Sequence, residues 1–264
     1  MFAKKSLGQN FLSDLETARK VVEAGGITRD TPVLEIGPGR GFLTRFLVDA
    51  GARITAVEKD RELAALLPGM FPGAPLNVIE ADFLELDLAP LAALRPVVVG
   101  NLPYYAAMPI LMKVLEHAGT WPRLVFMFQL EVARRLTASA GTPDYGVPTA
   151  VVSLTHSASI VRRISPGAFF PRPKVESALV RFLPLDQPLL DRPADRLAFG
   201  DFVAASFRFR RKKGSNALSL GTGLDPATAA AHMERLGLDP GARLEVLSPT
   251  DLVRLWKGIA ASAR

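Results

Sequence analysis

The fold is constrained most by a regular alternation of short apolar runs with amphipathic stretches between residues 31 and 128. The apolar runs contain mostly Val, Ile and Leu with little polar alternation, which is typical of strands buried on both faces of a sheet. The predicted strands are Val33–Ile36, Arg53–Val57, Leu76–Ile79, Val97–Val99 and Leu124–Phe128. The predicted helices are Phe42–Ala50, Arg61–Leu67, Met108–His117 and Leu130–Thr137. Because strands and helices alternate, we expect an α/β fold with a doubly wound, mostly parallel sheet.

The rest of the chain predicts the end of this domain and a smaller helical domain. Two further strands are predicted around Ile160–Ile164 and Ala178–Leu183. After Pro184 the composition changes, and the remaining sequence contains the start signals of several short helices. We therefore predict two domains, residues 1–186 and 187–264, with the boundary near residues 185–193.

Composition narrows the class of protein. The net charge of +6 is typical of a protein with a polyanionic partner, and equally of one with a solvated basic surface. The chain has no cysteine, which excludes disulfides and thiolate metal sites, and its three histidines lack the spacing of metal ligands. We therefore expect no metal. Because no apolar run is long enough for a signal peptide or a membrane span, we expect a cytoplasmic protein without membrane contact.

A glycine-rich turn follows the first predicted strand. The run Glu35–Gly41 reads EIGPGRG and places Gly37 and Gly39 two residues apart, with a helix next. Glycines at this point let the backbone approach a ligand where side chains would clash. The spacing is not that of a dinucleotide-binding turn, because Phe42 occupies the third glycine position, and no Gly-Lys-Ser/Thr follows as a P-loop requires.

Two acidic residues follow the next two predicted strands. Glu58 ends the second strand, and Asp82 follows the third. Residues just past the carboxyl ends of neighbouring parallel strands line one crevice. Glu58 can accept hydrogen bonds from both hydroxyls of a ribose, and Asp82 can accept one from an adenine amino group. Either acid alone is explained as a polar strand end, but together with the glycine turn they indicate an adenosine-bearing cofactor.

The most specific motif follows the fourth predicted strand, where Asn101, Leu102, Pro103 and Tyr104 stand in succession. The N6 lone pair of adenine is delocalised into the ring and is a poor nucleophile. Hydrogen bonds from this amine to the Asn101 side-chain oxygen and to a nearby backbone carbonyl would favour a tetrahedral nitrogen. Tyr104 can stack on a flipped-out base. The motif therefore predicts methyl transfer to a planar amine, catalysed by positioning and electrostatics rather than by a strong base.

Together these motifs closely resemble the rRNA adenine N6,N6-dimethyltransferases, the family of KsgA and of the Erm antibiotic-resistance enzymes. The resemblance runs from Lys5 to about Leu218. It rests on the segments Gly8–Leu12, Glu35–Gly41, Glu58, Asp82–Phe83, Asn101–Tyr104, Phe128–Ala133 and Phe169–Ser177. It implies a Rossmann-like class I methyltransferase domain that uses S-adenosylmethionine and releases S-adenosylhomocysteine, followed by a helical RNA-binding domain.

The resemblance also implies roles for individual residues. Cofactor contacts are expected at Gln9, Asn10, Leu12, Gly37, Gly39, Gly41, Glu58, Asp82, Phe83 and Asn101. Catalytic roles are expected for Asn101, Leu102, Pro103, Tyr104 and Phe169, with the rings of Tyr104 and Phe169 stacking on the base. Two positions depart from the family pattern: Tyr105 replaces a small polar residue, and Arg172 interrupts a run of prolines. Either change could alter the shape of the target pocket.

A basic run predicts the RNA surface. Five cations, interleaved with Phe209, occur within six residues: Arg208, Arg210, Arg211, Lys212 and Lys213. Clustered cations bind phosphates, and aromatic rings between them can stack on exposed bases. Although such a run is often only a solvated face, here it follows an apolar helix and resembles a basic segment of the family. Lys4 and Lys5 could add to this surface, and Arg162 and Arg163 are weaker candidates.

The function that the resemblance implies is dimethylation of two adjacent adenosines in the 3′-terminal hairpin of 16S rRNA, with the immature small subunit as the partner and a monomeric enzyme. Two alternatives remain. One is an Erm-type enzyme acting on 23S rRNA. The other is a binding protein, such as a transcription or assembly factor, that keeps the fold without catalysis; the presence of Glu58, Asp82 and Asn101–Tyr104 speaks against it.

Overall fold

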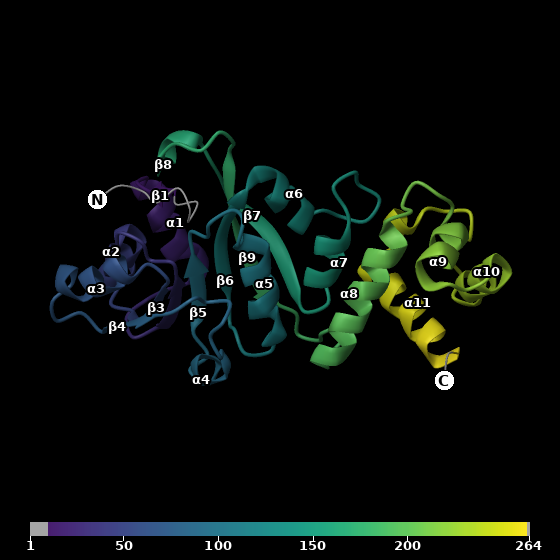
Figure 1. Ribbon diagram of the computed structural model, residues 1–264, viewed down its shortest axis with the longest axis horizontal. Coiled ribbons are helices and arrows are strands. Elements are labelled where there is room, and N and C mark those ends of the chain that lie inside the picture. The colour runs from purple at the N-terminus through teal and green to yellow at the C-terminus, as the bar shows by residue number, and fades with distance from the viewer. Residues whose placement is uncertain (1–9, 263–264) are drawn as a thin grey trace. The chain divides into compact units, whose positions relative to one another are not determined.

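The computed structural model of the chain describes residues 10–262 and divides into two compact units (Figure 1). Unit 1 comprises the chain up to Ala133 together with Ala158–Pro184, and unit 2 comprises Arg134–Ser157 and the chain from Leu185 onward. The predicted boundary at 186/187 lies two residues from the division at Pro184. The assignment of residues 134–157 to the first domain is wrong, because Tyr145, Ala150 and Leu154 pack into the apolar core of unit 2.

A seven-stranded sheet forms the centre of unit 1, and its strands follow the order β4-β3-β2-β5-β6-β9-β7. The strands are β2 (Pro32–Ile36), β3 (Arg53–Glu58), β4 (Leu76–Glu80), β5 (Val97–Gly100), β6 (Leu124–Gln129), β7 (His156–Ile164) and β9 (Ser177–Pro184). The strands β2 to β6 pair in parallel, and β9 pairs antiparallel to β6. The predicted doubly wound, mostly parallel α/β sheet is therefore confirmed.

The direction of the winding reverses at β2. Its neighbours are β3 on one side and β5 on the other, although β4 comes between these two in the sequence. In open parallel sheets the crevice at such a reversal, outside the carboxyl ends of the strands, is where ligands bind. The glycine turn follows β2 and Asn101 follows β5, so both predicted motifs meet at this crevice.

Helices cover both faces of the sheet. They are α1 (Leu15–Gly25), α2 (Phe42–Asp49), α3 (Arg61–Met70), α4 (Ala89–Ala92), α5 (Ala107–Glu116) and α6 (Leu130–Leu136). The core on one face includes Val21, Leu47 and Val99, all almost inaccessible to solvent. Burial of these side chains stabilises the layers, at roughly 25 cal/mol for each Å² of apolar surface removed from water.

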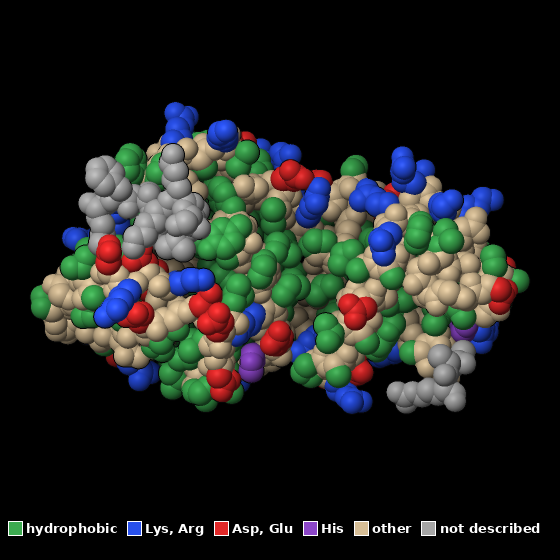
Figure 2. All heavy atoms as spheres, viewed as in Figure 1, with side chains coloured by type: hydrophobic (Ala, Val, Ile, Leu, Met, Phe, Trp, Pro, Cys, Tyr) green, Lys and Arg blue, Asp and Glu red, His purple; other side chains and the backbone are tan. Residues whose placement is uncertain are grey.

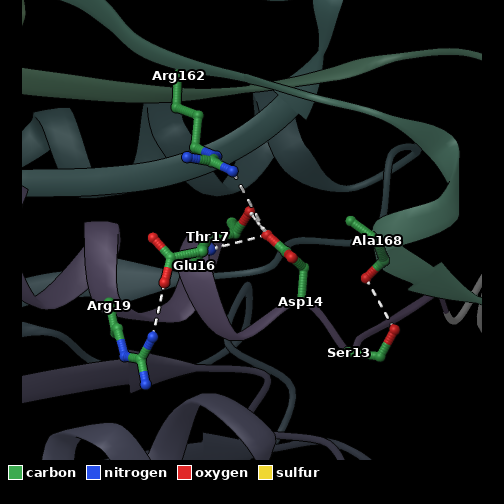
Figure 3. Close-up of polar contacts among 7 residues, drawn as sticks. All are labelled: Ser13, Asp14, Glu16, Thr17, Arg19, Arg162 and Ala168. Carbon is green, nitrogen blue, oxygen red and sulfur yellow. Dashed lines mark hydrogen bonds and ion pairs between the residues drawn. The ribbon is translucent and has the colours of Figure 1, made fainter.

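A small antiparallel ladder lies beside the main sheet. It joins β1 (Phe11–Leu12) to β8 (Phe169–Phe170), which follows the short 3₁₀ helix η2 (Pro166–Ala168). The backbone N–H of Ser13 donates to the carbonyl oxygen of Ala168 at 2.8 Å and extends the ladder. The hydroxyl of Ser13 donates to the same oxygen at 3.1 Å (Figure 3). Asp14 then caps α1 by accepting from the backbone N–H of Thr17. The ladder thus fixes the N-terminal segment on the segment that precedes β9.

Unit 2 is helical, as the composition after Pro184 predicts. Its elements are α7 (Val147–Val152), α8 (Pro193–Phe207), α9 (Gly214–Thr222), α10 (Pro226–Arg235), η3 (Leu244–Val246) and α11 (Pro249–Ser262). Phe199, Val203 and Leu255 are buried in its core. Asp225 caps α10 through the backbone N–H groups of Ala227 and Thr228. Within residues 10–262, no helix has the length and apolar character needed to cross a lipid bilayer.

Candidate active site

A cavity occupies the crevice at the carboxyl ends of β2, β3, β4 and β5. Most of the predicted site residues line it: Asn10, Leu12, Gly37, Gly39, Glu58, Asp82, Phe83, Asn101, Leu102, Pro103 and Tyr104. Of the remaining predictions, Gln9 lies outside the described residues, and Gly41 and Phe169 are not among the lining residues. The chain segments that carry the lining residues are far apart in the sequence, and the fold brings them together.

The glycine turn combines left-handed backbone with open space. Gly37, Gly39 and Gly41 have φ angles of 67°, 57° and 72°, a region that side-chain-bearing residues adopt only with strain. A Cβ atom on Gly37 would meet nothing within 4 Å, whereas one on Gly41 would lie 2.9 Å from the ring of Phe71. Gly37 therefore leaves room in the cavity, and Gly41 allows the turn to pack against α3 and the residue after it.

Glu58 fixes the glycine turn and remains an acceptor. The backbone N–H of Gly39 donates to its Oε2 at 2.9 Å, and that of Asp60 donates to its Oε1 at 2.8 Å. Burial raises the pKa of Glu58, and these two hydrogen bonds act in the opposite direction. Each carboxylate oxygen has two acceptor sites, so one on each oxygen is left for a ligand. Two adjacent acceptors match the two hydroxyls of a ribose.

Asp82 presents a charged acceptor in the same cavity. Its Oδ2 lies 2.5 Å from the Nζ of Lys59, and its Oδ1 accepts from the backbone N–H of Leu84 at 3.0 Å. The hydrogen bond from Lys59, followed by that from Leu84, holds the pKa of Asp82 below its usual value. Phe83 is buried beside it and lines the cavity. A carboxylate next to an apolar wall suits a heterocycle that carries an amino group.

The loop after β5 is anchored at both ends of the predicted motif. The Nδ2 of Asn101 donates to the backbone carbonyl of Asn10 at 2.7 Å, which makes Oδ1 the acceptor available to a substrate. The hydroxyls of Tyr104 and Ser177 are hydrogen-bonded at 2.7 Å, and burial raises the pKa of Tyr104. Tyr104 is therefore a neutral, oriented ring at neutral pH.

Glu35 lines the same cavity, although the sequence pattern indicated no role for it. It lies within β2, is only 1% exposed and accepts a hydrogen bond from the hydroxyl of Thr44 at 2.8 Å. Burial raises its pKa to about 8, while the bond from Thr44 acts to lower it. The sequence signal was an acidic residue inside an otherwise apolar strand, which is rare without a role.

The two aromatic residues of β8 differ sharply in exposure. Phe169, the predicted stacking ring, is 4% exposed and belongs to the apolar core of unit 1, whereas Phe170 is 64% exposed. The packing gives the stacking role of Phe169 no support, and that role stays a prediction. Tyr105, which departs from the family pattern, is 61% exposed and lines the cavity.

The predicted basic RNA segment, residues 208–213, lies between α8 and α9 in unit 2. Arg208, Arg211, Lys212 and Lys213 are exposed. Arg210 is instead engaged within unit 2, since its Nε lies 2.9 Å from the Glu245 carboxylate and its Nη2 donates to the carbonyl of Pro143. Phe209 packs against the apolar core of unit 2. The structure therefore presents cations here without the exposed aromatic ring that the sequence analysis expected.

Known proteins similar in sequence to this chain are ribosomal RNA methyltransferases. Residues 2–261 match the family described as ribosomal RNA adenine dimethylase. A small-subunit rRNA methyltransferase A of Rubrobacter xylanophilus is 40% identical over 97% of this chain and 95% of its own length. The protein of the same name from Anaeromyxobacter dehalogenans is 39% identical, over 97% of this chain and 93% of its own.

Solved structures share the fold. The 23S rRNA methyltransferase ErmE is 29% identical, with a TM-score of 0.72 over 95% of this chain and all of its own. A dimethyladenosine transferase from Plasmodium falciparum is 22% identical, with a TM-score of 0.81 over 96% of this chain and 98% of its own. At 22% identity, the Plasmodium falciparum structure shows only that the fold is shared.

Proposed function

The chain belongs to the ribosomal RNA adenine dimethylase family, and from this premise we propose that it dimethylates N6 of two adjacent adenosines in the 3′-terminal hairpin of 16S rRNA. The curated relatives reported above are named for the small ribosomal subunit, which supports this target over 23S rRNA. The observation that carries the proposal is the cavity at the sheet reversal, where the glycine turn and the Asn101 loop face a common space.

The cavity fits S-adenosylmethionine, which supplies an electrophilic methyl group on a sulfonium. The acceptors of Glu58 would hold the ribose, and the carboxylate of Asp82 would accept from the adenine amino group, with Phe83 beside the ring. The open space above Gly37 would admit the remainder of the molecule. Within residues 10–262, no group of three or more potential ligand residues is placed to hold a metal ion.

The residues of the Asn101 loop would then activate the target amine. The Oδ1 of Asn101 accepts a hydrogen bond from the N6 amino group and draws it out of conjugation with the purine ring. Tyr104 holds the base by stacking, with its hydroxyl fixed on Ser177. The nitrogen would become cationic as the methyl group arrives and would then lose its proton to water, so no strong base is required. Positioning and electrostatic stabilisation supply the rate enhancement.

The two units would have different roles in substrate binding. Unit 1 would bind the cofactor and the target base, and the exposed cations Arg208, Arg211, Lys212 and Lys213 of unit 2 would contact rRNA phosphates. We propose that the enzyme acts as a monomer on the immature small subunit in the cytoplasm.

The test is methyl transfer from labelled S-adenosylmethionine to ribosomal subunits. These come from a strain that lacks adenine dimethylation in both the small-subunit and the large-subunit rRNA. We expect label in small-subunit RNA only, recovered as N6,N6-dimethyladenosine after digestion to nucleosides. Label confined to the large subunit would instead support an Erm-type enzyme. RNA binding without label in either subunit would support a non-catalytic assembly factor and would refute the proposal.

A further inference from the structure

The β1–β8 ladder sorts four apolar side chains onto two faces. The register pairs Phe11 with Phe170 and Leu12 with Phe169. Directly opposed residues of antiparallel strands point to the same face, and successive residues point to opposite faces. Leu12 and Phe169 are both buried in the core of unit 1, so Phe11 and Phe170 share the other face. Phe11 lines the cavity, and Phe170 is exposed beside it.

The segment that begins at Phe170 is attached to the site at both of its ends. At the start, the ladder and the two bonds from Ser13 to Ala168 hold it against the cavity-lining strand β1. At the end, Ser177 is hydrogen-bonded to Tyr104 of the catalytic loop. Residues 170–176 therefore form a short exposed loop fixed next to the position proposed for the target base. We call residues 170–176 the flanking loop.

The flanking loop carries the side chains that bind single-stranded nucleic acid. Arg172 and Lys174 are exposed, and no ion pair of either is found among residues 10–262. Figure 2 shows Lys and Arg side chains at the edge of unit 1 where Figure 1 places β8. An exposed aromatic ring followed by two exposed cations is a combination that can stack on a base and neutralise the adjoining phosphates. Glu176 is also exposed and limits the net charge of the loop to +1.

We propose that the flanking loop binds the unpaired nucleotides next to the target adenosine, with Phe170 stacking on a neighbouring base and Arg172 and Lys174 contacting phosphates. This inference rests on the proposed function, since it assumes an RNA target in the cavity. It adds a surface in unit 1 that recognises the neighbours of the target rather than the target itself. The stacked ring would keep the strand open while the adenine occupies the cavity.

The stacking is tested with a hairpin RNA that carries fluorescent 2-aminopurine on either side of the target adenosine. Stacking on Phe170 is expected to quench the probe at one of these positions when the RNA binds. Phe170→Ala should abolish the protein-dependent quenching, Phe170→Tyr should retain it, and Phe170→Leu should not restore it, because it lacks a planar ring. Leu94→Ala removes a similarly exposed apolar side chain of unit 1 that does not line the cavity, and should change nothing.

Kinetics separate a binding role from a structural one. Stacking on a neighbouring base contributes to binding equally before and during methyl transfer. Phe170→Ala should therefore raise KM for RNA by about 10- to 100-fold and leave kcat nearly unchanged. Its melting temperature and its affinity for S-adenosylmethionine should match those of the wild type, because the ring of Phe170 is exposed.

The phosphate contacts are tested by salt dependence. The double variant Arg172→Gln, Lys174→Gln should weaken RNA binding and reduce the slope of log K against log salt by roughly 1.4, at about 0.7 for each phosphate contact to a single strand. The matched control, Arg45→Gln with Arg61→Gln, removes two exposed cations of α2 and α3. The slope of log K against log salt should decrease less in this control than in the double variant.

The outcomes distinguish this proposal from the function on which it rests. If the wild type methylates small-subunit RNA but Phe170→Ala quenches the probe and binds RNA as the wild type does, Phe170 does not stack on a neighbouring base and this proposal fails, while the proposed function stands. If the wild type transfers no methyl group to any RNA, both proposals fail. An equal loss of salt slope in the control variant would also overturn the phosphate contacts.

Discussion

Asn101, the side chain that we propose receives the target amine, shows how one contact with the backbone can orient a polar group. Its Nδ2 donates to the carbonyl oxygen of Asn10, so the side-chain oxygen is the atom left to receive the target amine. Tyr104, three residues later, is oriented in the same way by Ser177. Both side chains are thus held in place before a substrate arrives, which lowers the cost of reaching the reactive geometry.

Removal of either side chain should therefore strongly slow methyl transfer without preventing RNA binding. We expect Asn101→Ala to lower kcat by roughly 10²- to 10³-fold, because a preorganised hydrogen bond to developing charge is lost. Tyr104→Ala should be similarly impaired. Tyr104→Phe keeps the ring, loses only the bond to Ser177, and should retain most of the activity. Single-turnover methylation and filter binding measure these effects, and normal turnover in both alanine variants would refute the mechanism.

Glu35 should give the protein a distinctive pH dependence. Its pKa is about 8 in the folded protein and near 4.5 when exposed, so between these values the folded state binds one more proton than the unfolded state. The free energy of unfolding contributed by this group therefore falls as pH rises from 4.5 to 8, by at most about 1.4 kcal/mol per pH unit.

Glu35→Gln lacks this proton and retains an oxygen for the hydroxyl of Thr44. The melting temperature of the wild type should decrease relative to that of the variant as pH is raised from 5 to 8 without cofactor. Thermal unfolding monitored by circular dichroism at several pH values provides the measurement. Parallel curves for the two proteins would show that Glu35 ionises normally.

The sequence predicted those site residues whose position follows from strand order. Glu58 ends β3, and Asp82 and Asn101 follow β4 and β5 of the same parallel sheet, so strand order alone places them in one crevice. The burial of Phe169 and the exposure of Phe170 could not be predicted in this way. They depend on the register of a two-residue ladder with a segment far away in the sequence, which local patterns do not encode.

The glycine turn between β2 and α2 has two separable functions. All its glycines have positive φ, but a Cβ atom on Gly37 would enter open cavity space, and one on Gly41 would collide with Phe71 and Leu67. Gly73 has a similar φ of 76° with open space around it, outside the cavity, and is a matched control for backbone strain.

We expect Gly37→Ala and Gly73→Ala to lose about 1 kcal/mol of stability each from backbone strain alone. Gly41→Ala should lose about 3 kcal/mol, because overpacking adds to the strain. Only Gly37→Ala should weaken S-adenosylmethionine binding at constant stability, by about 10-fold. Chemical denaturation and isothermal titration calorimetry measure the two quantities. Equal affinity in Gly37→Ala and Gly73→Ala would place the cofactor elsewhere.

The buried strands were predictable from the sequence, because short, continuous apolar runs are typical of strands that are buried on both faces of a sheet. The strands β2, β3 and β4 begin where the sequence placed them, to within a residue. The placement of segment 134–157 was not predictable, because it depends on packing against α8, which begins only at Pro193, well after the segment in the sequence; that packing assigns the segment to unit 2.

For the whole molecule, affinity for rRNA should come from cations in both units. In unit 2 the structure distinguishes Arg210, which is bonded to Glu245, from its exposed neighbours. The triple variant Arg208→Gln, Arg211→Gln, Lys212→Gln should reduce the salt slope of RNA binding by about 2 to 3 at an unchanged melting temperature. Arg210→Gln should instead lower the melting temperature. Unchanged RNA binding in the triple variant would remove this segment from the interface.

The proposed arrangement of cofactor and target base is tested most directly by a crystal structure of the protein with S-adenosylhomocysteine and adenosine. We expect the ribose of the cofactor product on Glu58, its adenine next to Asp82, and its sulfur facing the N6 amine of an adenosine stacked on Tyr104 and bonded to the Oδ1 of Asn101. A cofactor product bound away from the glycine turn, or a loop after β5 with no room for a base, would contradict it.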